Sequence, residues 1–333
     1  MTNLLPKLNV PNVDINGKKM KQPTVISLFA GGGGSSLGYK MAGFKELLAV
    51  EWDKSAVEVL KKNFPGLSIY HGDIKTLNEK ECAKLAKIKP GELDLLDGSP
   101  PCQGFSMANK NRKVIDKKNE LYLEFARILK YLKPKMFLIE NVVGMTTGKM
   151  KFRYLEMLST YRELGYFVKG MILNAAHYGT PQNRHRTIIL GRIDKEPTFP
   201  TPETKLISVK EALSGIIVNQ NNVFKNKEGS KIIKQMSQTK QGQTNLSYNT
   251  QRRLSWHRPS PAILTSRARA HWHPAEDRPL ILAELKKLSG FPDDFWFPGE
   301  VSGIKIIGNC VPPPLMTAIA KHIIKQLEEI NAQ

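Results

Sequence analysis

A single cysteine, Cys102, stands in a setting that suits a nucleophile. It follows an apolar stretch, residues 93–96, that predicts a buried strand. The chain then reads Gly98-Ser99-Pro100-Pro101, and the two prolines fix the backbone just before the thiol. Ligands bind at the carboxyl ends of the strands in open α/β sheets, so a thiol placed there would face a ligand. The alternative is a small buried hydrophobe, which is the usual place of a free cysteine.

Glycines and acids at three other predicted strand ends indicate a nucleoside cofactor. The first strand runs into Gly31–Gly34, and glycines at such a turn let a cofactor approach the backbone. Glu51 ends the second strand and could accept ribose hydroxyls, while Trp52 beside it could stack on adenine. Asp73, after the third strand, could accept from the adenine amino group. The G-x-G-x-x-G spacing of dinucleotide binders is absent, and the alternative is a plain glycine turn with surface acids.

Further polar side chains could act on a substrate held in the same cleft. Glu140 ends the predicted strand 136–139 and would point toward Cys102, unless it only caps the following helix. Arg184 and Arg186 lie two residues apart, so they share a face of an extended chain and suit clamping a carbonyl or phosphate. The alternative for the two arginines is a solvated basic strand edge.

Strand and helix signals alternate along the first part of the chain. The predicted strands are 25–30, 47–50, 67–70, 93–96, 136–139, 166–174 and 187–192, and the predicted helices are 54–63, 79–88, 120–132 and 152–164. This alternation predicts a doubly wound, mostly parallel α/β sheet.

The amino-acid composition changes after residue 192. Prolines at 197, 200 and 202 mark a boundary, and residues 203–260 are polar and rich in amides and lysines. Helical signals return over 280–289 and 312–330. We expect a basic tail over 1–22, a main domain of 23–195 plus 304–333, and a smaller irregular domain over 196–303.

The charge balance predicts a polyanionic partner. The 333 residues carry 50 Lys+Arg against 30 Asp+Glu, which gives a net charge of +20. Nucleic acid is the first candidate for so basic a protein. Three cysteines without a CxxC pair predict neither a zinc site nor a disulfide framework, and no metal is expected. No membrane span or signal peptide is expected either.

These blocks, in this order, resemble the DNA (cytosine-5)-methyltransferase family of bacterial and phage restriction–modification systems. The resemblance covers about residues 24–195 and 255–325. The matching blocks are Phe-Ala-Gly-Gly-x-Gly from Phe29, Glu51-Trp52-Asp53, Gly72-Asp73-Ile74, Pro-Pro-Cys-Gln-Gly-Phe-Ser from Pro100, Glu140-Asn141-Val142, Gln182-x-Arg184-x-Arg186 and Gly308-Asn309-x-Val311-Pro312. The resemblance implies a Rossmann-like, S-adenosylmethionine-dependent fold with a smaller target-recognition domain.

The resemblance also implies a mechanism. The thiolate of Cys102 would add to C6 of cytosine, which makes C5 a nucleophile toward the methyl group of S-adenosylmethionine. Glu140 would hold or protonate N3, and Arg186, with Arg184 nearby, would donate to O2 or to phosphate. S-adenosylhomocysteine would be the product. The implied cofactor contacts are Phe29, Gly31, Gly33, Glu51, Trp52, Asp73, Ile74, Pro101, Asn309 and Val311.

Double-stranded DNA is the implied partner, with the target base flipped out of the stack. Residues 103–120 would form a loop that closes over the base, and residues 196–272 would choose the sequence. The implied loop and DNA residues are Gln103, Ser106, Arg112 and Gln182. The resemblance further implies a monomer in the cytoplasm, associated with the nucleoid, which protects host DNA from a cognate endonuclease without a stable complex.

Two positions depart from the family, and two other functions stay open. Ser27 stands where family members often have Asp, and Cys310 replaces a small residue, usually Ala or Ser. The first alternative function is a transfer-RNA cytosine-5 methyltransferase of the same fold. The second is a non-catalytic DNA-binding regulator, against which the intact Cys102, Glu140 and Arg186 argue. The glycine spacing excludes a nicotinamide dehydrogenase.

Overall fold

The computed structural model describes residues 22–101, 121–216, 231–245, 251–265 and 270–332. The chain forms two compact units. The first unit contains residues 1–173, 185–201 and 316–333, and the second contains residues 174–184 and 202–315.

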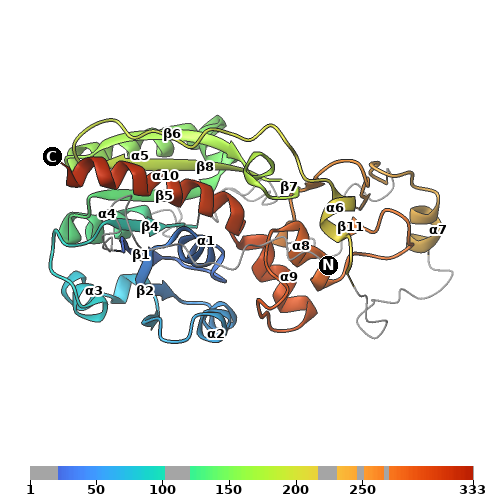
Figure 1. Ribbon diagram of the computed structural model, residues 1–333, viewed down its shortest axis with the longest axis horizontal. Coiled ribbons are helices and arrows are strands. Elements are labelled where there is room, and N and C mark those ends of the chain that lie inside the picture. Colours follow the sequence, from blue (N-terminus) through green and yellow to red (C-terminus); the bar gives the residue numbers. More distant parts are fainter. Residues whose placement is uncertain (1–21, 102–120, 217–230, 246–250, 266–269, 333) are drawn as a thin grey trace, which may run out of the picture. The chain divides into compact units, whose positions relative to one another are not determined.

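A seven-stranded sheet forms the centre of the first unit (Figure 1). Its spatial order is β3-β2-β1-β4-β5-β8-β6. Strands β3, β2, β1, β4 and β5 pair in parallel, and β8 runs antiparallel to β5. The bounds are β1 Thr24–Leu28, β2 Lys45–Glu51, β3 Ile69–His71, β4 Leu95–Gly98, β5 Met136–Val142, β6 Phe167–Asn174 and β8 His185–Arg192. The predicted doubly wound, mostly parallel α/β sheet is confirmed.

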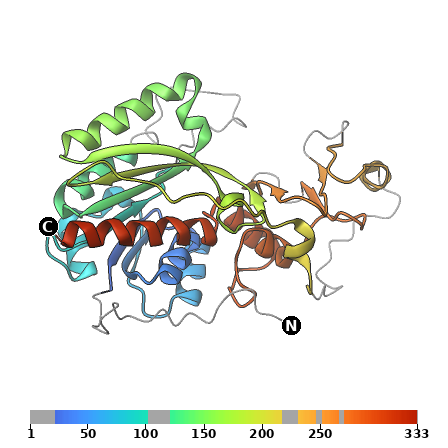
Figure 2. The ribbon, with the colours of Figure 1, turned by 45° about the horizontal axis from the view of Figure 1, so that its top comes forward.

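Helices cover both faces of this sheet (Figure 2). One face packs against α3, α4 and α5 in a core that includes Ile26, Leu96 and Phe137. On the other face α1 packs closely against α10, since a Cβ at Gly38 would lie 2.5 Å from Cβ of Met316. The bounds are α1 Gly34–Ala42, α2 Lys54–Asn63, α3 Glu79–Ala86, α4 Leu121–Leu132, α5 Lys151–Glu163 and α10 Pro313–Asn331. Short 3₁₀ turns are η1 Ile74–Thr76, η4 Val143–Thr146, η5 Gly148–Met150 and η6 Ala175–Tyr178.

The second unit is built from short elements. Its helices are α6 Val209–Leu213, α7 Lys231–Ser237, α8 Leu282–Leu288 and α9 Glu300–Asn309. Its strands are β7 Gln182–Asn183, β9 Arg252–Arg253, β10 Ser260–Pro261 and β11 His271–Trp272, which pair as β7 with β10 and β9 with β11. Phe291, Phe295 and Phe297 pack ring against ring, with centroids about 5 Å apart, and form part of its core.

The division of the chain differs from the predicted boundaries at residues 174–184, 196–201 and 304–315. Residues 174–184 group with the second unit because β7 pairs with β10 and because Arg184 donates to main-chain carbonyls of that unit. Residues 304–315 group there as well, because α9 packs closely on other parts of that unit, with Gly308 against the backbone of Thr265. Residues 196–201 stay with the first unit, where Thr198 donates its amide to Gln326 of α10.

A buried polar cluster lies on the α1 side of the sheet. Ser27 on β1 and Asp97 on β4 are paired positions, and both side chains are buried. Burial raises the pKa of Asp97 well above its usual range, although the nearby Tyr39 hydroxyl on α1 opposes the shift. Ser36 of α1 donates to Glu46 of β2 at 3.1 Å.

We expect Glu46→Gln to stabilise the protein at alkaline pH. Burial raises the pKa of Glu46 to about 7, and the hydrogen bond from Ser36 offsets only part of the shift. Between the pKa of the unfolded chain, near 4.5, and this value, the folded protein holds a proton that the unfolded chain has lost. The free energy of unfolding therefore falls as pH rises through this window, by about 2–3 kcal/mol for this group.

Urea unfolding of both proteins at pH 5 and pH 8 measures this effect. Glu46→Gln should remove most of the fall in unfolding free energy between pH 5 and pH 8 that the parent protein shows. Glu58→Gln, at an exposed position of α2, should leave that fall unchanged. An identical pH dependence in Glu46→Gln and the parent would contradict the assignment.

Candidate active site

The turn after β1 is shaped by residues with left-handed backbone. Phe29, Gly31 and Gly33 have φ values of 58°, 57° and 78°. Gly33 is the N-cap of α1, and a Cβ there would lie 2.7 Å from the ring of Phe64. At Gly31 nothing lies within 4 Å of the Cβ position. The turn thus leaves open backbone at the carboxyl end of β1, as a bound cofactor requires.

Glu51 ties this turn to the end of β2. Its Oε2 accepts the amide of Gly31 at 2.7 Å, and its Oε1 accepts the amides of Trp52 and Asp53 at 2.9 and 2.8 Å. Burial raises the pKa of Glu51, and the amide donors partly counter it. A carboxylate has about four acceptor positions, so Glu51 keeps capacity for a hydroxyl donor of a ligand.

Two further predicted residues lie beside Glu51. Trp52 is 66% exposed, which is unusual for so large an apolar ring and leaves its face open for stacking. Asp73 follows β3, which pairs with the end of β2, and its carboxylate caps the turn η1 through the amide of Lys75 at 3.0 Å. Ile74 is buried in the core. The structure thus brings the glycine turn, Glu51, Trp52 and Asp73 to the carboxyl ends of three neighbouring parallel strands.

Glu140 and Arg186 form an ion pair at the carboxyl end of β5. Glu140 lies on β5 and Arg186 near the start of the adjacent antiparallel strand β8. Arg186 Nε lies 2.7 Å from Glu140 Oε1, and both side chains are largely buried. Nη1 of Arg186 donates to the carbonyl of His185 at 2.8 Å. This pair presents a carboxylate and a guanidinium together, which can recognise the acceptor and donor edges of a planar heterocycle.

Asn141 fixes the end of β4 against the end of β5. Its buried Nδ2 donates to the carbonyl of Pro100 at 3.0 Å, and its Oδ1 accepts the amide of Val142 at 2.8 Å. Pro101 is half-buried and directly precedes Cys102. The sequence placed Asn141 within a motif but assigned it no role. The signal available was an amide next to Glu140, and its partner, Pro100, lies two residues beyond the end of β4.

Four predicted site residues lie outside the described residues: Cys102, Gln103, Ser106 and Arg112. Their roles stay predictions. The described chain reaches Pro101, and β4 pairs with β5 up to Gly98 and Ile139. In sequence, Cys102 therefore comes four residues after Gly98, the last paired residue of β4. It follows Pro100 and Pro101 directly, and Asn141 bonds to the carbonyl of Pro100.

Gln182 and Arg184 are both buried within the second unit. Gln182 accepts the amide of Ile263 and donates to Leu288 and Ser289. Arg184 is 2% exposed and donates to the carbonyls of Ile263 and Gly308 at 3.0 and 2.7 Å. These bonds occupy both terminal nitrogens, so the predicted donation of Arg184 to a base or phosphate has no support in this geometry.

The remaining predicted cofactor residues also belong to the second unit. Asn309 ends α9 and is exposed, while Val311 follows it and is buried. Cys310 between them is buried too. Within the described residues, no group of three or more His, Cys, Asp or Glu side chains could hold a metal ion. No helix in the described part of the chain is long and apolar enough to cross a membrane.

The comparisons with known proteins agree with this geometry. Residues 23–325 match the family of C-5 cytosine-specific DNA methylases. The chain is 35% identical to the type II methyltransferase M1.HphI of Haemophilus parahaemolyticus over 91% of this chain and 87% of that protein. It is 31% identical to M.DdeI of Desulfomicrobium norvegicum over 92% and 90%.

Solved structures show the same fold. A DNA modification methyltransferase encoded within a prophage of E. coli superposes with a TM-score of 0.78 at 26% identity, over 92% of this chain and 100% of that one. The Entamoeba histolytica methyltransferase EhMeth gives a TM-score of 0.71 at 19% identity over 92% and 99%, which supports the fold alone.

The fold and the strand-end residues define an S-adenosylmethionine-dependent methyltransferase class. Within it, the chain belongs to the C-5 cytosine-specific DNA methylases. It is a DNA (cytosine-5)-methyltransferase of the type found in bacterial restriction–modification systems.

Proposed function

We propose that this enzyme methylates C5 of a flipped-out cytosine within a short sequence of double-stranded DNA, through a covalent bond from Cys102 to C6. The observation that carries the proposal is the ion pair of Glu140 and Arg186 on β5 and β8. It lies beside the end of β4, which leads into the Pro-Pro-Cys segment. A target carbon within the duplex stack is out of reach, so the base must leave the helix.

Each side chain meets a need of this chemistry. Glu140 holds N3 of the base and supplies a proton there as C6 is attacked, which stabilises the electron density that moves into the ring. Arg186 orients Glu140 and donates to O2. Cys102 attacks C6 as a thiolate. After C5 has taken up the methyl group, the C5 proton passes to water, the C6–S bond breaks and Cys102 leaves as the thiolate. Asn141 holds the residues that precede Cys102 through the carbonyl of Pro100. Arg184 joins segments within the second unit through the carbonyls of Ile263 and Gly308 rather than contacting substrate.

We assign cofactor binding to the strand-end residues of the first unit, and the cofactor roles of Asn309 and Val311 stay predictions. Glu51 accepts ribose hydroxyls, Trp52 stacks on adenine and Asp73 accepts from its amino group. Bound S-adenosylmethionine supplies the methyl group that C5 takes up. The open backbone at Gly31, the exposed ring of Trp52 and the unfilled acceptor capacity of Glu51 fit a nucleoside of this kind.

Glu51→Ala is expected to weaken S-adenosylmethionine binding. Loss of hydrogen bonds to a charged acceptor costs about 1.5–3 kcal/mol, which corresponds to a roughly 10- to 100-fold higher dissociation constant. Calorimetric titration with cofactor measures the change, and Glu58→Ala, at an exposed position of α2, serves as the matched control. Because Glu51 also holds the turn, a thermal unfolding curve should accompany the titration. An unchanged dissociation constant would remove Glu51 from the cofactor site.

The setting we propose is a bacterial or phage restriction–modification system. Methylation there protects DNA from a cognate endonuclease, with which no stable complex is needed. The enzyme would act as a monomer, because each flipped base is a separate target, and it would work on the nucleoid in the cytoplasm. The relatives named above as type II methyltransferases support this setting.

A parallel assay on two substrates tests the proposed function. The purified enzyme and labelled S-adenosylmethionine are incubated with unmethylated duplex DNA and, separately, with unmodified transfer RNA. Label in DNA alone is the expected result. Label in transfer RNA alone would show that the substrate is RNA and not DNA. Label in neither, with cofactor binding intact, would indicate a non-catalytic regulator.

A further inference from the structure

Asp97 is a buried carboxyl that the chemistry described so far does not use. It is 2% exposed and lies one residue before the end of β4. Among the described residues it has no salt-bridge partner, and its Oδ1 accepts no hydrogen bond. Burial of a polar group without a partner costs free energy, and ionisable groups buried in this way are concentrated at functional sites.

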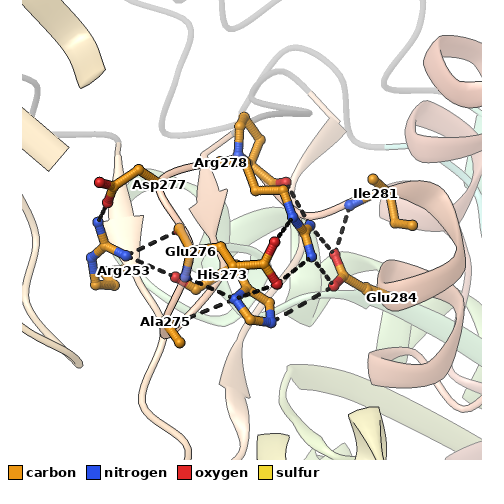
Figure 3. A network of polar contacts seen from close by, with 9 residues as sticks. Arg253, His273, Ala275, Glu276, Asp277, Arg278, Ile281 and Glu284 are labelled. Atoms are coloured by element: carbon orange, nitrogen blue, oxygen red, sulfur yellow. Dashed lines mark hydrogen bonds and ion pairs between the residues drawn. The ribbon is translucent and has the colours of Figure 1, made fainter. Parts of the chain in front are cut away.

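The other almost fully buried carboxylates that the structure describes have a cation or several amides as partners. The cationic pairs are Asp94 with Lys135, Glu140 with Arg186, and Glu284 with Arg278, at 2.8, 2.7 and 2.8 Å. Figure 3 shows the last of these pairs, within the second unit, as part of a larger network of charged side chains. Glu51 accepts three backbone amides. Among these buried carboxyls, Asp97 is therefore the one without either kind of partner.

The register of the sheet places Asp97 on the same face as both parts of the proposed site. Asp97 pairs with Ser27 of β1, and Glu51 lies two residues beyond the position of β2 that pairs with Ser27. On the other side, Glu140 lies two residues beyond the position of β5 that pairs with Asp97. Paired positions of neighbouring strands share a face of the sheet, and so do residues two apart on one strand. Asp97 therefore lies between Glu51 and Glu140 on one face.

Backbone hydrogen bonds hold these strand ends in line. The amide of Ser99, two residues after Asp97, donates to the carbonyl of Leu28 at the end of β1 at 3.3 Å. The amide of Ala30 donates to the carbonyl of Val50 on β2 at 3.0 Å. The end of β4 therefore lies directly beside the glycine turn that we assign to the cofactor.

The order of the strands determines which part of the cofactor comes nearest to Asp97. We assign the ribose to Glu51 at the end of β2 and the target base to Glu140 near the end of β5. Strands β1 and β4 lie between β2 and β5. A methyl group that passes from this cofactor to the base must therefore cross the ends of β1 and β4, and Asp97 lies on β4 at that place.

The described groups that face Asp97 keep its carboxyl neutral as long as no cation is near. Burial raises the pKa of Asp97 well above its usual range, and the carboxyls of Glu46 on β2 and Glu140 on β5 act in the same direction. Glu140 is itself paired with Arg186 of β8. The Tyr39 hydroxyl of α1 opposes the shift, and burial raises its own pKa, so it stays uncharged. The buried side chains that α10 contributes are apolar: Met316, Ile319, Ala320 and Ile323.

From these observations we propose that Asp97 distinguishes the methyl donor from the product by the charge on its sulfur. S-adenosylmethionine carries a positive charge there, and S-adenosylhomocysteine carries none. The inference rests on the proposed function, because it uses the assigned place of the cofactor.

The discrimination follows from the loss and return of one proton. Asp97 gives its proton to water when the cation is bound nearby, because a positive charge stabilises the carboxylate in a buried site. Once the methyl group has left and the sulfur is neutral, Asp97 takes up a proton from water and its attraction for the ligand ends. The side chain thus favours binding of the methyl donor over retention of the product.

Calorimetric titration of the parent protein and of Asp97→Asn with both ligands, at pH 6 and at pH 9, tests the proposal. The dissociation constant of S-adenosylhomocysteine is divided by that of S-adenosylmethionine, so that groups acting equally on both ligands cancel. A ligand that favours the ionised carboxyl binds more tightly as pH rises. In the parent this ratio should rise by about 10-fold, as expected for opposite charges on the order of 10 Å apart inside a protein. In Asp97→Asn it should be the same at both pH values.

The same titrations in two buffers of different ionisation enthalpy count the protons released on binding. The parent should release more protons than Asp97→Asn when S-adenosylmethionine binds, and the two proteins should release equal numbers with S-adenosylhomocysteine. Asp94→Asn is the matched control, because it removes a buried carboxylate at the amino end of β4, and it should behave like the parent.

Two results would overturn the inference. One is a ratio of dissociation constants that does not change with pH in the parent. The other is an equal rise of the ratio in Asp97→Asn, because that would assign the response to another group. Should Asp97→Asn fail to fold, Tyr39→Phe takes its place. Its hydroxyl favours the ionised form of Asp97, so the rise should move to higher pH in this variant, and an unmoved rise would contradict the inference.

These titrations also separate the inference from the proposed function, because they need neither DNA nor methyl transfer. A ratio that depends on pH through Asp97, in a protein that labels no DNA, would support the inference and refute the proposed function. A constant ratio in a protein that does label DNA would refute the inference alone.

Discussion

Replacement of Cys102 by serine is expected to abolish methyl transfer to DNA while S-adenosylmethionine binding is retained. A serine hydroxyl ionises far less readily than a thiol and is a much poorer nucleophile toward C6. The cofactor contacts that we assign at the ends of β1, β2 and β3 come from the glycine turn and from other side chains, so they should not depend on the sulfur. Methyl incorporation and a cofactor titration of the same preparation give the two readouts.

The other cysteines provide a matched control. Cys82 belongs to α3 and is fully buried in the core, and Cys82→Ala should keep methyl transfer at a modest cost in stability. Turnover by Cys102→Ser within tenfold of the parent would show that Cys102 is not the nucleophile, whatever the sequence resemblance implies.

Glu140→Gln is expected to lower the rate of methyl transfer by about 10²- to 10⁴-fold, the usual contribution of a general acid or base. The amide cannot supply a proton to N3, and it leaves Arg186 without the carboxylate that now lies 2.7 Å from Nε. Cofactor affinity should change little because Glu51, not Glu140, joins the glycine turn. Single-turnover methylation at saturating DNA separates this loss from a change in DNA binding.

Glu163→Gln, an exposed carboxylate on α5, is the control for the loss of one negative charge. A rate for Glu140→Gln equal to that of this control would leave the ion pair with a structural role only. A lower rate together with an equally lower cofactor affinity would also contradict the assignment, since it would mean that the whole site had shifted.

The sheet could be predicted from sequence because its strands are short apolar runs broken by turn residues. Helices α1 and α9 were not predicted. Helix α1 contains Gly34 and Gly38, which disfavour a helix, and it forms because Gly38 allows α10 to pack directly on it. In α9, Gly308 likewise faces backbone of Leu264 and Thr265. In both helices, contacts with distant parts of the chain outweigh the local preference.

Prediction of the site residues from sequence was limited in the same way, by contacts with distant parts of the chain. Residues at strand ends, such as Glu51 and Glu140, could be placed because parallel strands align their carboxyl ends. The bonds of Arg184 could not, because its acceptors, Ile263 and Gly308, lie 79 and 124 residues away. The resemblance to the family implied a substrate contact for Arg184, yet the fold turns the side chain inward. Asn141 was likewise recognisable only once Pro100 was seen beside it.

The most direct test of the central claim is transfer of a tritiated methyl group from S-adenosylmethionine to unmethylated genomic DNA, followed by bisulfite sequencing of the product. Our account predicts label in DNA and protected cytosines confined to one short sequence motif. Absence of label in DNA, from enzyme that still binds S-adenosylmethionine, would contradict it.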